Sequence, residues 1–119
     1  MRISKRSLNK GDIIQTEEVI EYVKEIHGLR DFDNGNLYNS LNKFDYYQVD
    51  YVTISDLNID EYFKFEWLVD KYIDMYRSNK NYPPIVISNN YRIIDGNHRS
   101  NALFRFGLNK IKVIRGVLK

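Results

Sequence analysis

The pentapeptide DGNHR, residues 95–99, holds the side chains of this sequence that are best suited to chemistry. It follows the apolar run of residues 91–94 and precedes a helical pattern, so a strand leads directly into a helix. A helix that begins in this way presents its first backbone amides and the positive end of its dipole at the end of the strand. The sequence therefore predicts an anion site in residues 95–100, which we call the seam.

Each residue of the seam has an expected role in binding phosphate. Gly96 allows the backbone to turn sharply or to approach a ligand closely. Asn97 can cap the helix, so that the amides of His98, Arg99 and Ser100 point toward the ligand. We therefore expect all five of these residues to bind the phosphates.

Helical spacing gives Arg99 a special position. It lies near the centre of the apolar face formed by Ala102, Leu103 and Phe106. A buried cation needs a partner, and a guanidinium is well suited to bidentate phosphate binding. The alternative is that Arg99 pairs with Asp95 as a structural clamp.

Asp95, His98 and Arg99 are the candidate catalytic residues. Asp95 could orient His98 or Arg99, hold Mg²⁺ as a metal ligand, or polarise a nucleophile; alternatively it shapes the bend as an Asx-turn. His98 lies at the edge of the apolar face, where it either contacts the ligand or has a structural role. With His27 as the other histidine and no cysteine, the sequence speaks against a zinc site.

The N-terminal part of the chain is expected to be helix followed by loop. Residues 16–27 read as a helix that Thr16 can cap and that Gly28 can end. Its apolar stripe consists of Val19, Val23 and Ile26. Residues 30–48 have no clean period, which indicates a loop with a short helical turn.

A strand over residues 49–54 and a turn at Ser55–Asp56 lead into the longest predicted helix, residues 59–78. Its broad apolar face consists of Tyr62, Phe65, Leu68, Val69, Tyr72, Ile73 and Tyr76. Phe63 and Trp67 fall on the opposite, polar face. Either the N-terminal segments cover them, or they form an exposed aromatic patch for a partner.

The C-terminal part contains the elements that must position the seam. Residues 84–88 and 91–94 read as two strands joined by a tight turn at Asn89–Asn90. The helix after the seam ends at Gly107, and residues 111–118 alternate like a final strand. The order from residue 49 is β-α-β-β-α-β, an α+β (mixed α/β) domain.

This order and its motifs, PPIVIS, RII-DGNHR, AL-x-x-x-G and I-x-V, resemble the ParB/sulfiredoxin-like superfamily. The resemblance covers residues 49–118 and leaves residues 1–48 as an N-terminal helical extension packed on that core. The DGNHR form is most similar to members with DG-(H/N/Q)-HR. These include free-serine kinases, ParB-like nuclease-type domains common in phages and plasmids, and regulators of DNA modification systems.

The resemblance implies a nucleotide pocket in which the seam holds the phosphates of ATP or another nucleoside triphosphate. Carried over by position, residues 96–99 would cradle phosphate, and Asp95 would lie beside Mg²⁺ or the reacting group. Sulfiredoxins have a catalytic cysteine where Asn97 stands, which rules out reductase chemistry. The chain stops at Lys119 without the helix-turn-helix module of ParB clamps, so partition-site binding is not expected. The serine kinases take a base from outside the motif, for which Asp56, Asp60 and Glu61 are the candidates here.

Three classes of function remain open. The leading one is an Mg²⁺-dependent phosphotransferase or NTP hydrolase, which Lys64 and Lys71 could assist unless they are plain solvated charges. The second is DNA binding or cleavage by the basic C-terminal third. Its basic residues are Arg92, Arg105, Lys110, Lys112 and Arg115. The third is a non-catalytic protein partner that uses Phe63, Trp67 and the N-terminal extension.

Composition sets the outer limits. A chain of 119 residues fits one domain, and the absence of cysteine excludes disulfides and thiolate catalysis. No apolar run is long enough for a membrane span and the basic N-terminus lacks the apolar stretch of a secretory signal, so a cytoplasmic protein is expected. Residues 81–119 hold seven Lys/Arg and one Asp, whereas residues 31–80 hold five Lys/Arg and ten Asp/Glu. The electropositive last third suits an anionic ligand; alternatively, the fold balances these charges.

Overall fold

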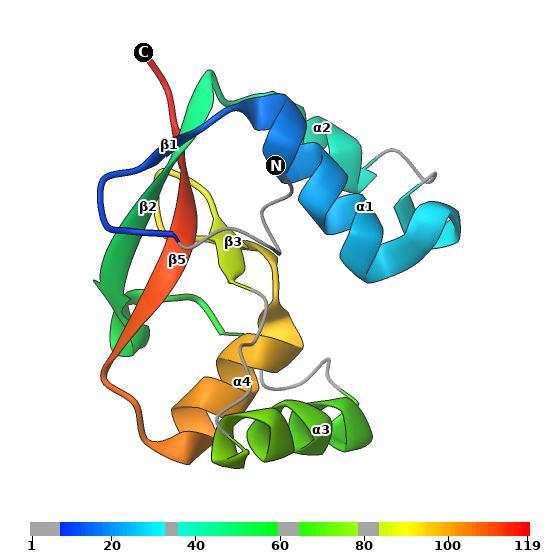
Figure 1. Cartoon of the computed structure of the whole chain (residues 1–119), viewed down its shortest axis with the longest axis vertical. Helices are drawn as coiled ribbons and strands as arrows, with labels where there is room; N and C mark the ends of the chain where they lie inside the picture. Colours follow the sequence, from blue (N-terminus) through cyan, green and yellow to red (C-terminus); the bar gives the residue numbers. More distant parts are fainter. Residues whose placement is uncertain (1–7, 33–35, 60–64, 79–83) are drawn as a thin grey trace.

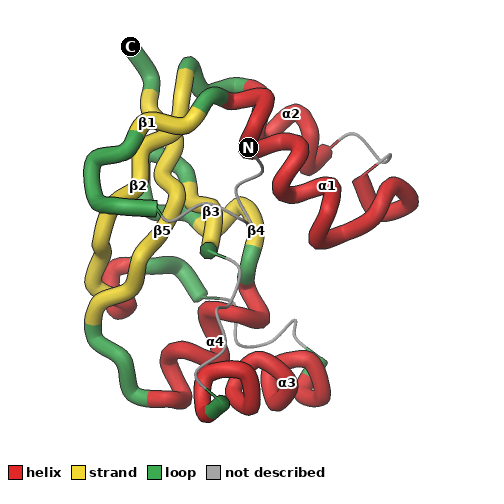
Figure 2. Tube along the Cα trace, viewed as in Figure 1, coloured by secondary structure: helices red, strands yellow, loops and turns green. Residues whose placement is uncertain are grey.

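The computed structural model describes residues 8–32, 36–59, 65–78 and 84–119, and these form one sheet with helices packed against it (Figures 1 and 2). The elements in chain order are β1 (Ile13–Ile14), α1 (Thr16–Phe32), α2 (Asn36–Asn42), β2 (Tyr46–Thr53), the 3-10 helix η2 (Ile54–Asp56), α3 (Glu66–Arg77), β3 (Ile85–Ile87), β4 (Ile93–Asp95), α4 (Asn97–Phe106) and β5 (Lys110–Val117). Among these helices, none has the length and apolar character needed to cross a bilayer.

The sheet has the strand order β1-β2-β5-β3-β4. Its longest pairing is antiparallel, between β2 and β5, and runs from Tyr46 opposite Val117 to Thr53 opposite Lys110. β5 also pairs in parallel with β3, and the short strand β4 pairs antiparallel with β3 at the edge. From β2 onward the order is β-α-β-β-α-β. The predicted α+β class is therefore confirmed.

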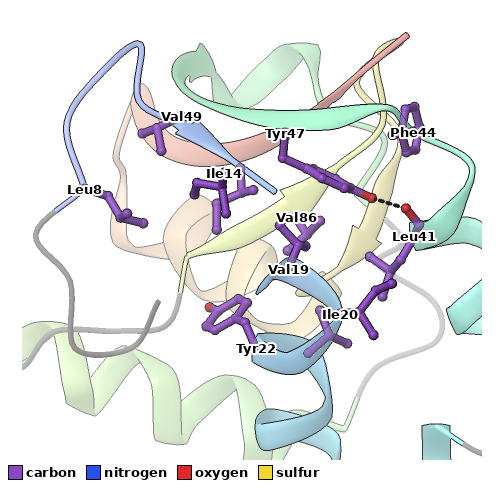
Figure 3. Packing of buried hydrophobic residues seen from close by; sticks show 12 residues of the cluster. Leu8, Ile14, Val19, Ile20, Tyr22, Leu41, Phe44, Tyr47, Val49 and Val86 are labelled. Atoms are coloured by element: carbon purple, nitrogen blue, oxygen red, sulfur yellow. Dashed lines mark hydrogen bonds between the residues drawn. The ribbon is translucent and has the colours of Figure 1, made fainter. Parts of the chain in front are cut away.

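Alternation along β3 and β5 divides the core between the two faces of the sheet. Val86 and Ile114 belong to a cluster with side chains of α1 and α2, part of which Figure 3 shows. Ile85 and Val113 point the other way and pack with Leu103 of α4. Consequently α1 and α2 cover one face, while α4 covers the other with α3 packed against it; the two helix pairs are separate in Figure 1.

Helix α1 is longer than expected. It continues through Gly28 to Phe32, so the prediction that Gly28 ends the helix is wrong. Val19 and Val23 are fully buried as predicted, whereas the side chain of Ile26 lies outside the described part. The Thr16 hydroxyl donates to the Phe44 carbonyl oxygen at 3.0 Å. Thr16 therefore ties the start of α1 to the segment that leads into β2.

The described part of residues 30–48 is mostly regular structure, which corrects the expectation of a loop. Helix α2 forms here because Leu41 reaches the core, and its carbonyl oxygen accepts a hydrogen bond of 2.7 Å from the Tyr47 hydroxyl (Figure 3). Tyr47 also meets Phe44 edge to face, with 5.5 Å between ring centroids. Burial raises the pKa of Tyr47 well above its usual value. β2 then starts at Tyr46 rather than residue 49, and β1 pairs along it, Ile13 opposite Gln48.

Helix α3 begins at Glu66, within the region predicted as helix from residue 59. Phe65 precedes it in an extended conformation and is exposed, which corrects its assignment to the apolar face. Val69 is fully buried; Leu68, Tyr72, Ile73 and Tyr76 are half-buried. Tyr62 and Phe63 lie outside the described residues. Trp67 is 66% exposed, so the expectation that N-terminal segments cover it is wrong.

The strands and helix around the seam follow the predicted order. In the turn between β3 and β4, Tyr91 rather than Asn89 or Asn90 has the positive φ, 68°. Gly107 ends α4 in the left-handed region at φ 91°, as predicted. Phe106 is partly exposed and packs against Tyr76 at 5.7 Å between centroids, which corrects its place in the core.

Gly116 of β5 provides a test of the packing between the sheet and the N-terminal segment. A Cβ at this position would lie 2.5 Å from the ring of Phe44, which is itself buried. We expect Gly116→Ala to lower the free energy of unfolding by about 1–3 kcal/mol, because a packed ring must move. Phe44→Leu should relieve the clash. In urea denaturation, the double variant should therefore lose less free energy of unfolding than the two single variants lose together. Strictly additive losses would contradict this packing.

Candidate functional site

Within the seam, a single residue, Gly96, separates β4 from α4. β4 ends at Asp95, Gly96 has φ 112° and ψ 28°, and α4 begins at Asn97. A Cβ on Gly96 would lie 3.0 Å from Cγ1 of Ile85 and 3.1 Å from Nη2 of Arg99. Glycine is thus required both by the left-handed conformation and by the guanidinium beneath it. Gly96, and not Asn97, is the N-cap, and no side chain caps the helix.

Arg99 is buried, as the helical spacing predicts, with 2% of its surface exposed. Its guanidinium forms an ion pair with the equally buried carboxylate of Asp95. Nη1 also donates to the Pro84 carbonyl oxygen at 3.0 Å and to the Tyr22 hydroxyl at 3.2 Å. These contacts form the structural clamp that the sequence left open as the alternative for Arg99.

Electrostatics keep this guanidinium charged. Burial alone would lower the pKa of Arg99, but the negative charge of Asp95, with Tyr22 and Tyr72 nearby, outweighs burial and raises the pKa above its usual value. A desolvated cation with an anionic partner retains its proton in this way. The seam therefore contains a permanent positive charge whose nearest counter-ion is Asp95.

Tyr22 connects helix α1 to the seam, a role that sequence reasoning missed. Its hydroxyl donates to the Pro84 carbonyl oxygen at 2.7 Å and accepts from Arg99. Burial raises the pKa of Tyr22 well above its usual value, which keeps the hydroxyl protonated. One signal was present in the sequence: Tyr22 shares the helical stripe of Val19 and Val23, so its polar tip had to find a buried partner.

His98 faces helix α3. Its Nε2 accepts a hydrogen bond of 3.0 Å from the backbone N–H of Phe65. The imidazole of His98 also stacks on the ring of Phe65, with an interplanar angle of 1° and 5.7 Å between the ring centroids. In the neutral imidazole the proton then lies on Nδ1. His98 thus links the start of α4 to the start of α3.

The remaining residues of the first turn are held by the helix itself. The amide of Ser100 donates to the Gly96 carbonyl oxygen at 2.8 Å, and its hydroxyl donates to the same oxygen at 2.9 Å. The Ser100 amide is therefore used within the helix, contrary to the expectation that it points at a ligand. Asn101, which sequence reasoning also missed, is buried and donates from Nδ2 to the Asn97 carbonyl oxygen at 2.8 Å.

The structure describes two of the accessory residues predicted for catalysis. Asp56 is exposed in η2 and Lys71 is exposed on α3. Asp60, Glu61 and Lys64 lie outside the described residues. Within the described part of the chain, no group of three His, Cys, Asp or Glu side chains could hold a metal ion.

Several basic residues of the C-terminal third have partners within the fold. Arg105 binds Glu66 through two hydrogen bonds, at 2.7 and 3.0 Å. Arg115 pairs with Asp50 at 3.3 Å, and Nζ of Lys112 donates to a backbone carbonyl oxygen at 2.6 Å. Three of the five cations proposed for DNA binding are therefore engaged within the fold.

No family model matches the sequence, and no curated protein matches it. Among solved structures, it is similar to a Pnob8-like ParB N-domain in its C2221 crystal form, with a TM-score of 0.51 and 21% identity over 61% of this chain. The chain has a ParB-like fold. A second structure, of a pNOB8-like ParB N-domain, has a TM-score of 0.45 and 24% identity, again over 61% of this chain. The matched part is 31% and 28% of those two chains, less than a third of each.

The clamp can be tested within this ParB-like domain by removing one ion at a time. Asp95→Asn should lower the free energy of unfolding by about 3–5 kcal/mol, because it leaves a buried guanidinium without its counter-ion. The double variant with Arg99→Met should recover part of this loss, because it also removes the uncompensated guanidinium. Asp70→Asn, at an exposed position of α3, is the matched control and should change stability by less than about 0.5 kcal/mol. Equal effects of the two Asp→Asn variants in urea denaturation would contradict the clamp.

Tyr22→Phe tests the link to α1 separately. It removes the hydroxyl that bridges Arg99 and Pro84 and keeps the ring, so we expect a loss of about 1–2 kcal/mol from the unmade hydrogen bonds. Tyr51→Phe, on an exposed side chain of β2, is the control. If both variants denature at the same urea concentration as the parent, α1 is not coupled to the seam through this hydroxyl.

Proposed function

We propose that this ParB-like domain binds a nucleoside triphosphate such as ATP, with the phosphates at the seam. The observation that carries the proposal is the start of α4: Gly96 brings the backbone to the surface without a side-chain cap, and the guanidinium of Arg99 lies directly behind it. The amides of residues 97–99 lie at the positive end of the helix dipole. Backbone amides, helix dipole and a fixed cation together favour a phosphate here.

The roles of the seam residues follow from their contacts. Gly96, Asn97 and His98 are half-buried and would meet the phosphates directly. Arg99 would act from behind Gly96, through its charge, because its guanidinium is bonded to Asp95, Tyr22 and Pro84. Asp95 holds that guanidinium in place. Ser100 fixes the first turn by its two hydrogen bonds to Gly96.

The donor set does not fit a Mg²⁺ ion held by the protein. Asp95 is the one carboxylate of the seam, and it is paired with Arg99. Mg²⁺ in nucleotide sites is usually bound by the phosphates, by water and by one or two carboxylates. We therefore assign Mg²⁺ to the phosphates of the nucleotide and give Asp95 no metal-binding role.

Binding is the function that the described residues support best. Phosphotransfer or hydrolysis also needs a group that activates an acceptor or a water molecule. With Asp95 committed to Arg99, and with Nε2 of His98 accepting from Phe65, that group would have to come from elsewhere in the chain. Asp56, Asp60 and Glu61 are the candidates from the sequence.

The proposal is tested by calorimetry and thermal shift with ATP, CTP, GTP, ADP and inorganic tripolyphosphate, each with and without Mg²⁺. Ligand at about 100 times its Kd should stabilise the fold by about 2.7 kcal/mol. Asn97→Asp places a negative charge in the first turn of α4, which favours the helix and repels phosphate. We expect it to weaken binding by at least about tenfold.

Asn109→Asp is the matched control, because it makes the same change of charge at an exposed position after α4. It should bind like the parent protein. The proposal fails if none of these ligands raises the melting temperature, or if Asn97→Asp and Asn109→Asp bind equally well.

A further inference from the structure

Two aromatic side chains beside the seam face solvent. Phe65 is 63% exposed and Trp67 is 66% exposed, the highest values among the large hydrophobic residues that the structure describes. Their ring centroids are 6.4 Å apart, and the planes are inclined by 31°. We call these two rings the aromatic pair. Such exposed rings are suited to a ligand that has a flat apolar face.

His98 connects the aromatic pair to the seam. Its ring lies parallel to that of Phe65, and its Nε2 accepts from the backbone N–H of the same residue. Since His98 belongs to the first turn of α4, the aromatic pair begins where the proposed phosphate site ends. A molecule that places phosphates at the seam can therefore extend directly over these rings.

Charge fixes the direction in which such a molecule would lie. A hollow of about 540 Å³ extends from Trp67 along α3. Its lining residues are Trp67, Asp70, Lys71, Asp74, Met75 and Ser78. The two carboxylates outnumber the one lysine, so this end is net negative and opposes phosphates, whereas the helix dipole and Arg99 attract them at the seam. The phosphates therefore belong at the seam and the uncharged part of the ligand at the aromatic pair.

We propose that Phe65 and Trp67 stack against the nucleobase of the bound nucleotide. This inference rests on the proposed function, because it assumes phosphates at the seam. Aromatic stacking is open to every base, since each has a π-face. Glu66, which lies between the two rings in sequence, is held by Arg105 at 2.7 and 3.0 Å. We therefore expect a broad preference for purines over pyrimidines, from their larger ring area, rather than strict selection of one base.

The chain offers a direct probe, because Trp67 is its one tryptophan. ATP and inorganic tripolyphosphate are titrated against the full chain while intrinsic fluorescence is recorded, and affinities are measured by calorimetry. A stacked base should quench Trp67 in a saturable way, whereas tripolyphosphate should bind without comparable quenching. We expect ATP to bind at least about tenfold more tightly than tripolyphosphate.

Trp67→Leu separates stacking from phosphate binding. The side chain is exposed, so this variant should keep the fold, bind tripolyphosphate like the parent and lose about tenfold in affinity for ATP. Phe104→Leu is the matched control, because Phe104 is 52% exposed on α4 and should affect neither ligand. A GTP titration should resemble that of ATP, and CTP should bind more weakly.

The outcomes distinguish the two proposals. If neither ATP nor tripolyphosphate binds, the phosphate site fails, and the stacking site fails with it. If both bind with equal affinity, or if ATP binds without quenching Trp67, the seam is a phosphate site and the stacking site is refuted. The same conclusion follows if Trp67→Leu and Phe104→Leu have equal affinities for ATP.

Discussion

The guanidinium of Arg99 and the carboxylate of Asp95 form a buried ion pair on which the arrangement of the seam depends. Burying two charges has a desolvation cost that their attraction offsets only when the remaining donors find acceptors. Tyr22 on α1 and Pro84 before β3 supply those acceptors. The pair therefore brings together β4, α4, the start of β3 and the N-terminal helix, and it fixes how they meet.

The same interaction explains how a structural cation can sit beside a ligand site. Asp95 and α1 hold the guanidinium inside the fold, and its Nη2 lies 3.1 Å from the position that a Cβ on Gly96 would take. A phosphate at the start of α4 would then meet the positive end of this ion pair at short range in a poorly solvated setting, where electrostatic effects are strong. Arg99 would thus contribute to phosphate binding through its charge alone. The backbone at the start of α4 and His98 would contact the phosphate directly.

Sequence reasoning succeeded where the signal was local. The order β3-β4-α4-β5 could be predicted from the apolar runs on both sides of DGNHR and from Gly107, which ends the helix. The burial of Arg99 could be predicted from its helical spacing. It failed where partners come from distant segments. A two-residue strand such as β1 has no period, and a helical wheel cannot show that Tyr22 meets Arg99 across 77 positions. For Trp67 the sequence left two alternatives open, and the structure has the exposed one, since no segment in the described part of the chain covers the ring.

The central claim is that phosphates bind at the start of α4, and backbone NMR of the ¹⁵N-labelled chain tests it most directly. On addition of ATP with Mg²⁺, the amide signals of Gly96, Asn97 and His98 should shift most, because these groups would face the phosphates. The indole signal of Trp67 should shift with them. The account would be contradicted if these amides stayed unchanged while the largest shifts appeared at Arg92 or Lys110, the exposed cations of the other proposed surface.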